Sequence, residues 1–137
     1  MKHVRIGLAI LSAILLSSFI SVAQHGGSGV KEYDAFHDLL RVLQHEALPA
    51  NDMKTIRGKA KDLIKLGDAI VKLGVPQGTR EENEAKFKEG LQKFSEALKK
   101  YGTDAENGSD ADLKTSYMAV HDTYEELADM LPRRKSH

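Results

Sequence analysis

Two short segments of the chain share one pattern and contain the residues best suited to chemistry. Tyr33–Leu40 and Tyr117–Tyr124 both read Tyr-x-Ala-apolar-His-Asp-x-apolar, which gives His37 and His121 matching positions. In a helical heptad both histidines fall just beside the apolar stripe. Imidazole nitrogen combined with carboxylate oxygen suits Zn(II), Cu(II) or Ni(II). The pattern therefore indicates a candidate transition-metal site with His37 and His121 as primary ligands.

Three further side chains lie at helical spacing from these histidines. Asp34 precedes His37 by three residues and Glu125 follows His121 by four, so each carboxylate would share a helical face with its histidine. Met118, three residues before His121, would add a soft ligand for Cu(I). We expect these three residues to complete the shell. The alternative is that each histidine is a half-buried residue at the edge of the core, hydrogen-bonded to a tyrosine or carboxylate.

Four amphipathic segments predict the helices that carry these residues. Apolar side chains recur at spacings of three and four, which is typical of helices, and no segment alternates with the period of a strand. The fold class that we expect is all-α, an up-down-up-down antiparallel four-helix bundle over residues 30–131. The predicted helices cover about residues 30–48, 51–73, 79–101 and 109–131.

The height of the two histidines along these helices is compatible with a shared site. In an up-down bundle the first and last helices are antiparallel. At about 1.5 Å per residue, His37 and His121 would lie roughly 10 and 15 Å from the same end of the bundle. Whether the flanks that carry them face each other depends on the handedness of the bundle, which the sequence does not provide.

Local signals set the expected ends of the later helices. Thr79 followed by Glu82 predicts a capping box, and Ser109 followed by Asp112 predicts a weaker one. Between the third and fourth helices, Gly102–Gly108 is polar and bounded by glycine. We expect this segment to be the longest loop of the bundle.

The N-terminus resembles a secretory signal peptide. A basic start with Lys2 and Arg5 precedes an apolar run, and small residues stand at Ser21 and Ala23. The apolar run Ile6–Ile20 is shorter than the roughly 20 residues of a spanning helix, which favours cleavage over a retained membrane anchor. We expect a signal peptide over 1–23, a flexible lead-in over 24–29, the bundle over 30–131 and a basic tail over 132–137. This organisation predicts a periplasmic or secreted protein without stable membrane insertion after cleavage.

Composition excludes several classes of function. The 137 residues contain no cysteine, which excludes disulfides, thiolate metal sites, thiol nucleophiles and covalent haem attachment. The 20 basic and 20 acidic side chains balance, which argues against a nucleic-acid-binding protein. The basic residues of the second helix, Arg57 among them, are expected to form a solvated face. No nucleophile–base pair can be assembled from spacing alone, so we expect a protein that is not an enzyme.

The charges are divided between the predicted helices. The first and fourth together carry ten acidic and three basic side chains, whereas the second and third carry eight acidic and twelve basic ones. The two halves should therefore attract each other. The acidic half contains both histidines and would concentrate cations around them.

Two other functions remain open. His37 and His121 could hold haem b as axial ligands in an electron-transfer bundle, although Tyr33, Phe36 and Tyr124 occupy the stripe where a ring would need space. The bundle could instead be a cofactor-free, chaperone-like module that binds an envelope protein or forms a homodimer. The charge division and the wide apolar face of the second helix motivate this last alternative.

The layout over about residues 30–131 resembles soluble four-helix bundles of bacterial periplasms, including the haem-b and c′-type cytochromes. It also resembles small metal-binding helical domains associated with heavy-metal efflux, through Phe36-His37-Asp38 and Val120-His121-Asp122. The metal-domain resemblance implies cation binding by His37 and His121. The c′-type haem attachment is not implied, because the cysteines that it needs are absent.

Cleavage between Ala23 and Gln24 is directly testable. Intact-mass spectrometry of the exported protein should give an N-terminus at Gln24, because the small residues at positions −3 and −1 suit the peptidase. A mass that still includes residues 1–23 would instead identify this segment as a retained anchor.

Overall fold

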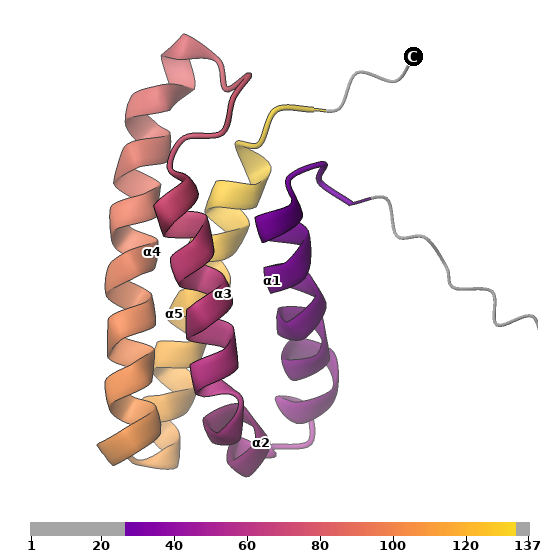
Figure 1. The fold of residues 1–137 in the computed structure, drawn as a ribbon. Coiled ribbons are helices and arrows are strands. Elements are labelled where there is room, and N and C mark those ends of the chain that lie inside the picture. The colour runs from indigo at the N-terminus through magenta and orange to yellow at the C-terminus, as the bar shows by residue number, and fades with distance from the viewer. Residues whose placement is uncertain (1–26, 134–137) are drawn as a thin grey trace, which may run out of the picture.

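All regular structure in the described part of the chain is helical, as predicted. The computed structural model describes residues 27–133, and no strand occurs in that range. The predicted signal peptide, the start of the lead-in and the end of the basic tail lie outside the described residues. The elements are α1 (Lys31–Val42), a π-helical turn η1 (Leu43–Ala47), α2 (Met53–Gly58), α3 (Ala60–Leu73), α4 (Glu81–Asn107) and α5 (Asp110–Asp129) (Figure 1).

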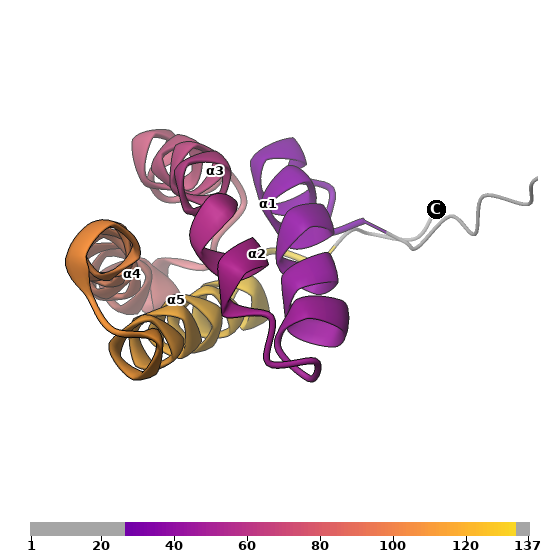
Figure 2. The same ribbon diagram turned by 90° about the horizontal axis from the view of Figure 1, so that it is seen from below.

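The long helices pack side by side around a shared core. α4 packs against both α3 and α5, and α3 also packs against α1 (Figure 1). Seen from below, the short helix α2 crosses the lower end of the molecule (Figure 2), where it contacts η1 and α5. Contact between α1 and α5 is made chiefly by large aromatic side chains, Tyr33 and Phe36 of α1 against Tyr124 of α5.

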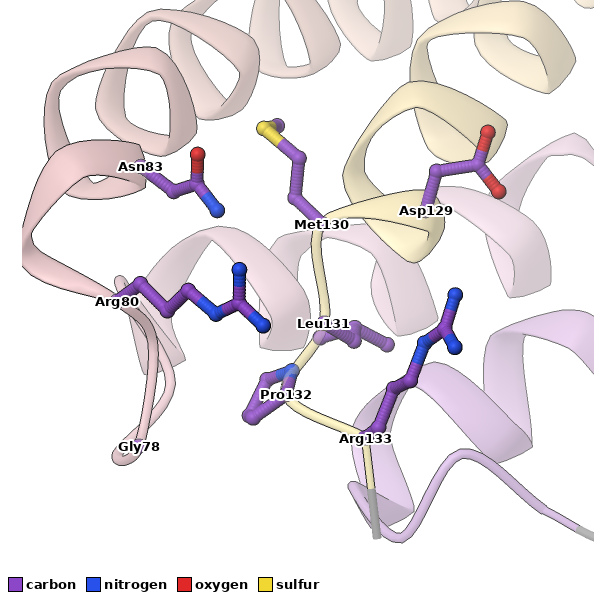
Figure 3. Close-up of a pocket in the computed structure, with 8 residues that line it drawn as sticks. All are labelled: Gly78, Arg80, Asn83, Asp129, Met130, Leu131, Pro132 and Arg133. Atoms are coloured by element: carbon purple, nitrogen blue, oxygen red, sulfur yellow. The ribbon is translucent and has the colours of Figure 1, made fainter.

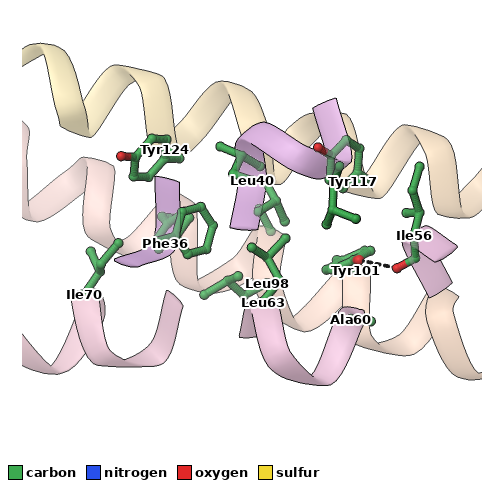
Figure 4. Packing of buried hydrophobic residues seen from close by; sticks show 14 of the residues in the cluster. Phe36, Leu40, Ile56, Ala60, Leu63, Ile70, Leu98, Tyr101, Tyr117 and Tyr124 are labelled. Carbon is green, nitrogen blue, oxygen red and sulfur yellow. Dashed lines mark hydrogen bonds between the residues drawn. The ribbon is translucent and has the colours of Figure 1, made fainter. Parts of the chain in front are cut away.

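The core is the set of apolar stripes that the sequence predicts. Side chains from all the helices meet in one cluster (Figure 4). Phe36 packs edge-on against Phe94 of α4, with ring centroids 5.4 Å apart, and stacks on Tyr124 of α5 at 4.8 Å. Burying one large apolar side chain stabilises a fold by about 1.5–3 kcal/mol, so this cluster is the main source of stability.

The predicted second helix is interrupted. α2 ends at Gly58 and α3 begins at Ala60, with Lys59 between them at ψ 0°. Glycine has little intrinsic preference for helix, which makes Gly58 an easy place to break the helical hydrogen bonding. The break leaves α2 as a separate short helix whose side chains reach the α4–α5 connection.

The loop predicted over Gly102–Gly108 is wrong, because α4 continues to Asn107. Gly102 acts as a close-packing residue: a Cβ there would lie 3.1 Å from Ile64 Cδ1 of α3. Tyr101 ties the same turn to α2 by donating a hydrogen bond of 2.6 Å to the Ile56 carbonyl (Figure 4). Tertiary contacts therefore override the helix-stop signal, and Gly108 and Ser109 alone connect α4 to α5.

One of the two predicted capping boxes forms. The Asp112 amide donates to Ser109 Oγ at 3.1 Å and the Ser109 amide donates to Asp112 Oδ2 at 3.4 Å, which confirms the box of α5. The box predicted at Thr79 is wrong. The Thr79 hydroxyl donates to the Pro76 carbonyl at 2.7 Å instead, and Arg80 occupies the N-cap position of α4 without a side-chain cap.

Arg57 of α2 binds the C-terminal end of α4. Its Nη1 donates to the carbonyls of Asp104 and Ala105, each at 2.9 Å. Its Nη2 donates to the Gly108 carbonyl at 3.2 Å and to Asp110 Oδ1 at 2.9 Å. The last carbonyls of a helix lack partners within it, so one guanidinium here satisfies several of them. Arg57 is therefore not part of a solvated face, which corrects the prediction.

A buried carboxylate stands beside this contact. The Asp104 side chain is 7% exposed, and Lys100, one turn earlier, donates to both of its oxygens at 2.7 Å. This hydrogen bonding to the ammonium lowers the pKa of Asp104 below its ordinary value. Asp104 thus remains ionised while its own backbone carbonyl accepts from Arg57.

We predict that Arg57→Met lowers the free energy of unfolding by about 2 kcal/mol, because it leaves acceptors at the end of α4 without their charged donor. Urea denaturation gives the value. The matched control is Lys54→Met on the exposed side of the same helix, which should change stability by less than about 0.5 kcal/mol. Equal losses in the two variants would contradict a special role for Arg57.

Candidate functional site

The flank of α1 that carries His37 faces α5. The His37 ring lies against the Tyr124 ring of α5, with centroids 6.4 Å apart and planes inclined by 24°. Gln44 follows His37 by seven residues and so belongs to nearly the same flank. Its Oε1 accepts a hydrogen bond of 3.2 Å from the Tyr117 hydroxyl of α5. Two separate contacts thus place this flank along α5.

The flank of α5 that carries His121 faces α1. On the opposite flank, Glu126 and Met130 line a hollow together with Lys93 of α4, so that side of α5 borders α4. With 3.6 residues per turn, His121 lies about 140° around the helix from Glu126. The face between these flanks is buried against the core. His121 therefore borders the α1–α5 seam, which we define as the line of contact between these two helices.

Tyr124 of α5 relates the positions of the two histidines. The His37 ring lies beside the Tyr124 ring. His121 precedes Tyr124 by three residues, which is about 4.5 Å along the axis of α5. Their environments differ. His37 is exposed, whereas the His121 side chain is 22% exposed and its Nδ1 lies 3.0 Å from Asp122 Oδ1.

The other predicted ligands are less well placed. Asp34 is half-buried, and its Oδ1 accepts a hydrogen bond of 2.6 Å from the Ser28 amide, so it closes the turn before α1. Glu125 is exposed, and Met118 is half-buried against the core. Within residues 27–133, no group of three or more histidine or acidic side chains is arranged to hold a metal ion. The described geometry thus brings His37 and His121 to one seam without gathering a closed shell.

The floor of the seam is aromatic. Tyr124 donates a hydrogen bond of 3.1 Å from its hydroxyl to the Tyr33 carbonyl, and its ring also contacts the Tyr33 ring. The Tyr33 hydroxyl is buried and has no hydrogen-bond partner among the described residues. Burial raises the pKa of both tyrosines well above the ordinary value. Both rings therefore act as neutral packing groups beneath the histidines.

Two tertiary contacts were not predicted from the sequence. Gln44 of η1 accepts a hydrogen bond from Tyr117 of α5, and its sequence signal is the seven-residue spacing from His37. Arg57, which sets the end of α4, has no local signal, because its partners are 47 to 53 residues away.

Comparison of the chain with protein-family models, with curated proteins and with solved structures gives no significant match. The resemblance to periplasmic cytochromes and to metal-binding bundles therefore stays a prediction that rests on the residues of this chain.

Removing the hydroxyl of Tyr33 and removing that of Tyr124 should change the stability of the protein in opposite directions. Tyr33→Phe removes a buried polar atom without a partner and should raise the free energy of unfolding by about 1 kcal/mol. Tyr124→Phe removes a formed hydrogen bond and should lower it by a similar amount, about 1 kcal/mol. Urea denaturation of the two variants measures both values, and a loss of stability in Tyr33→Phe would show that its hydroxyl has a partner in solution.

Proposed function

We propose that this chain is a small exported, non-catalytic helical-bundle protein that binds a divalent transition metal, Zn, Cu or Ni, through His37 and His121. The observation that carries the proposal is the position of the two imidazoles. The His37 ring lies against Tyr124 of α5, and helix geometry puts His121 about one turn before Tyr124, on the side of α5 away from Glu126 and α4. Imidazole nitrogen is the ligand type that these metals share.

The up-down-up-down arrangement belongs to this proposal. The helices group into four rods: the first is α1 with η1, the second is α2 with α3, the third is α4 and the fourth is α5. Each rod after the first packs against the one before it. The seam between α1 and α5 would close the ring of rods through aromatic contacts. In this arrangement the antiparallel first and last rods bring the two copies of the His-Asp pattern together.

The seam offers a metal ion two ligands and an open shell. Zn–N bonds are about 2.0–2.1 Å long, so shared ligation needs the two imidazole nitrogens within about 4–5 Å. His37 is exposed and free of hydrogen bonds to the rest of the described chain, so its ring can turn toward His121 at little cost. Water would fill the remaining positions, and exposed Glu125, one turn after His121, is the carboxylate that the spacing offers as a further ligand.

We propose a non-catalytic role because the spacing of the sequence offers no nucleophile–base pair. The described contact of His121 is with the Asp122 carboxylate, and that of His37 is with the Tyr124 ring.

The haem-b alternative has less support from the packing. Tyr33, Phe36 and Tyr124 fill the space between α1 and α5 and are at most 3% exposed. A haem held between His37 and His121 would have to displace these rings. The alternative of a docking module for an envelope protein, or of a homodimer, rests on the division of charge and on the apolar face of the second predicted helix, where Ile64, Leu66 and Val71 are half-buried against the core.

Export is proposed from the composition of residues 1–23. None of the helices between residues 27 and 133 has the length and apolar character needed to cross a bilayer. The proposed location is the periplasm or the cell exterior.

Metal titration of three histidine variants tests the proposal. We expect His37→Ala and His121→Ala each to weaken Cu(II), Ni(II) or Zn(II) binding at least tenfold, since each removes one of two imidazoles, and about 1.4 kcal/mol already corresponds to tenfold. The matched control is His45→Ala, an exposed histidine in η1, which should leave the affinity unchanged. Isothermal titration calorimetry measures the affinities.

Two results would contradict the metal site. One is equal affinity in the wild type and His37→Ala, which would remove His37 from the site. The other is a loss of affinity in His45→Ala as large as in the seam variants, which would indicate non-specific binding by surface histidines.

A further inference from the structure

A hollow of about 590 Å³ lies at the end of the molecule that carries the start of α4 and the end of α5 (Figure 3). Its size falls within the roughly 300–1,000 Å³ of small-molecule sites. The lining includes charged and amide side chains above an apolar floor. The hollow is lined by Arg80, Asn83, Asp129, Met130, Leu131 and Arg133, among others.

The turn at Gly78 and the segment that follows α5 form this hollow. Gly78 has a positive φ of 90°, and this turn brings the chain into α4 opposite the end of α5. A Cβ at Gly78 would lie 3.6 Å from Pro132 Cβ, so the two segments meet at the rim. α5 ends at Asp129, and Met130 and Leu131 continue in tight turns, with their amides bonded to the carbonyls of Leu127 and Ala128.

Two arginines reach into the hollow from different segments. Arg80 extends from the start of α4, and Arg133 extends from the segment after α5 (Figure 3). The guanidinium of Arg80 lies 3.6 Å from Glu82 Oε1, and both side chains are more than 70% exposed. An exposed ion pair of this kind contributes little to stability, so an incoming anion can replace it. Arg133 has no ion pair with another residue of the range 27–133.

The charge of the lining favours a singly charged anion. The lining itself has two arginines, Arg80 and Arg133, and one acidic side chain, Asp129. A monoanion that replaces Glu82 beside Arg80 neutralises the net positive charge of this lining. A phosphate dianion would leave an excess negative charge beside Asp129. The planar guanidinium matches a carboxylate in bidentate geometry, and the Asn83 amide adds a further hydrogen-bond donor.

The floor favours an apolar body on the same ligand. Met130 and Leu131 are half-buried and pack against the core, and Pro132 continues the apolar surface. Past Met130 the hollow adjoins a second one of about 440 Å³ between α4 and α5, which shares Asp129 and Met130. That second hollow lies over Gly90, where a Cβ would come within 2.9 Å of Leu127 Cδ2. The other side chains that line the second hollow are charged, Lys86, Glu89, Lys93 and Glu126, so the apolar contacts for a short aliphatic chain come from Met130 and Leu131.

We propose that this end of the molecule is a binding site for an aliphatic monocarboxylate. The carboxylate lies between Arg80 and Arg133, and the aliphatic chain lies on Met130 and Leu131. The site is on the opposite side of α5 from His121, so it stands independently of the proposed metal site.

A titration with hexanoate, followed by amide chemical shifts of the full chain, tests this site. We expect saturable shifts at the residues around the hollow with a millimolar dissociation constant. Arg80→Gln and Arg133→Gln should each weaken binding at least fivefold. The matched control is Arg41→Gln, an exposed arginine on α1, which should leave hexanoate binding unchanged. Circular dichroism of each variant verifies that the helices are retained.

Two comparison probes identify what is recognised. Hexanol has the same chain without the charge and should bind at least fivefold more weakly than hexanoate, while inorganic phosphate should also bind more weakly. Shifts that do not saturate, or that persist unchanged in the Arg80→Gln Arg133→Gln double variant, would overturn the proposal. Equal binding of phosphate or of hexanol would also overturn it, since recognition would then lack either the apolar or the charged part.

Discussion

The position of α5 depends on the contact between Arg57 and the end of α4. Four acceptors from the last turn of α4 and the start of α5 converge on one guanidinium. This contact sets the residue at which α4 stops and, through the connection of Gly108 and Ser109, the height at which α5 begins. Because His121 is on α5, this contact also bears on the height of His121 along the bundle.

Periodicity predicted the core, whereas several helix ends depend on tertiary contacts or on competing local hydrogen bonds. The apolar stripes and the Ser109–Asp112 box are local properties, since each is decided within a few residues. Gly102 carries a stop signal, but packing against Ile64 and the anchoring of Tyr101 keep that turn helical. The Thr79 hydroxyl turns to Pro76 within its own loop. Single-sequence reasoning has no access to these competing contacts.

The candidate site, too, could be predicted from the sequence only in part. The repeated pattern identified His37 and His121, and their heights followed from helix geometry. Their facing flanks did not follow, because flank depends on which neighbour each helix takes. The contacts of His37 with Tyr124 and of Glu126 with the α4 side supply that information. Asp34 illustrates the limit of spacing arguments: it stands at ligand spacing from His37, yet its carboxylate is used by the Ser28 amide.

The two-residue connection between α4 and α5 also has a consequence for how the chain folds. A helical hairpin with so short a link forms from contacts close in sequence, which lowers the entropy lost in closing the loop. α1 has its seam partner much farther along the chain, since Tyr124 of α5 bonds to the Tyr33 carbonyl 91 residues away. We therefore expect the α4–α5 hairpin to form early and α1 to dock last. The seam with the two histidines would then be the last part of the molecule to close and the first to open.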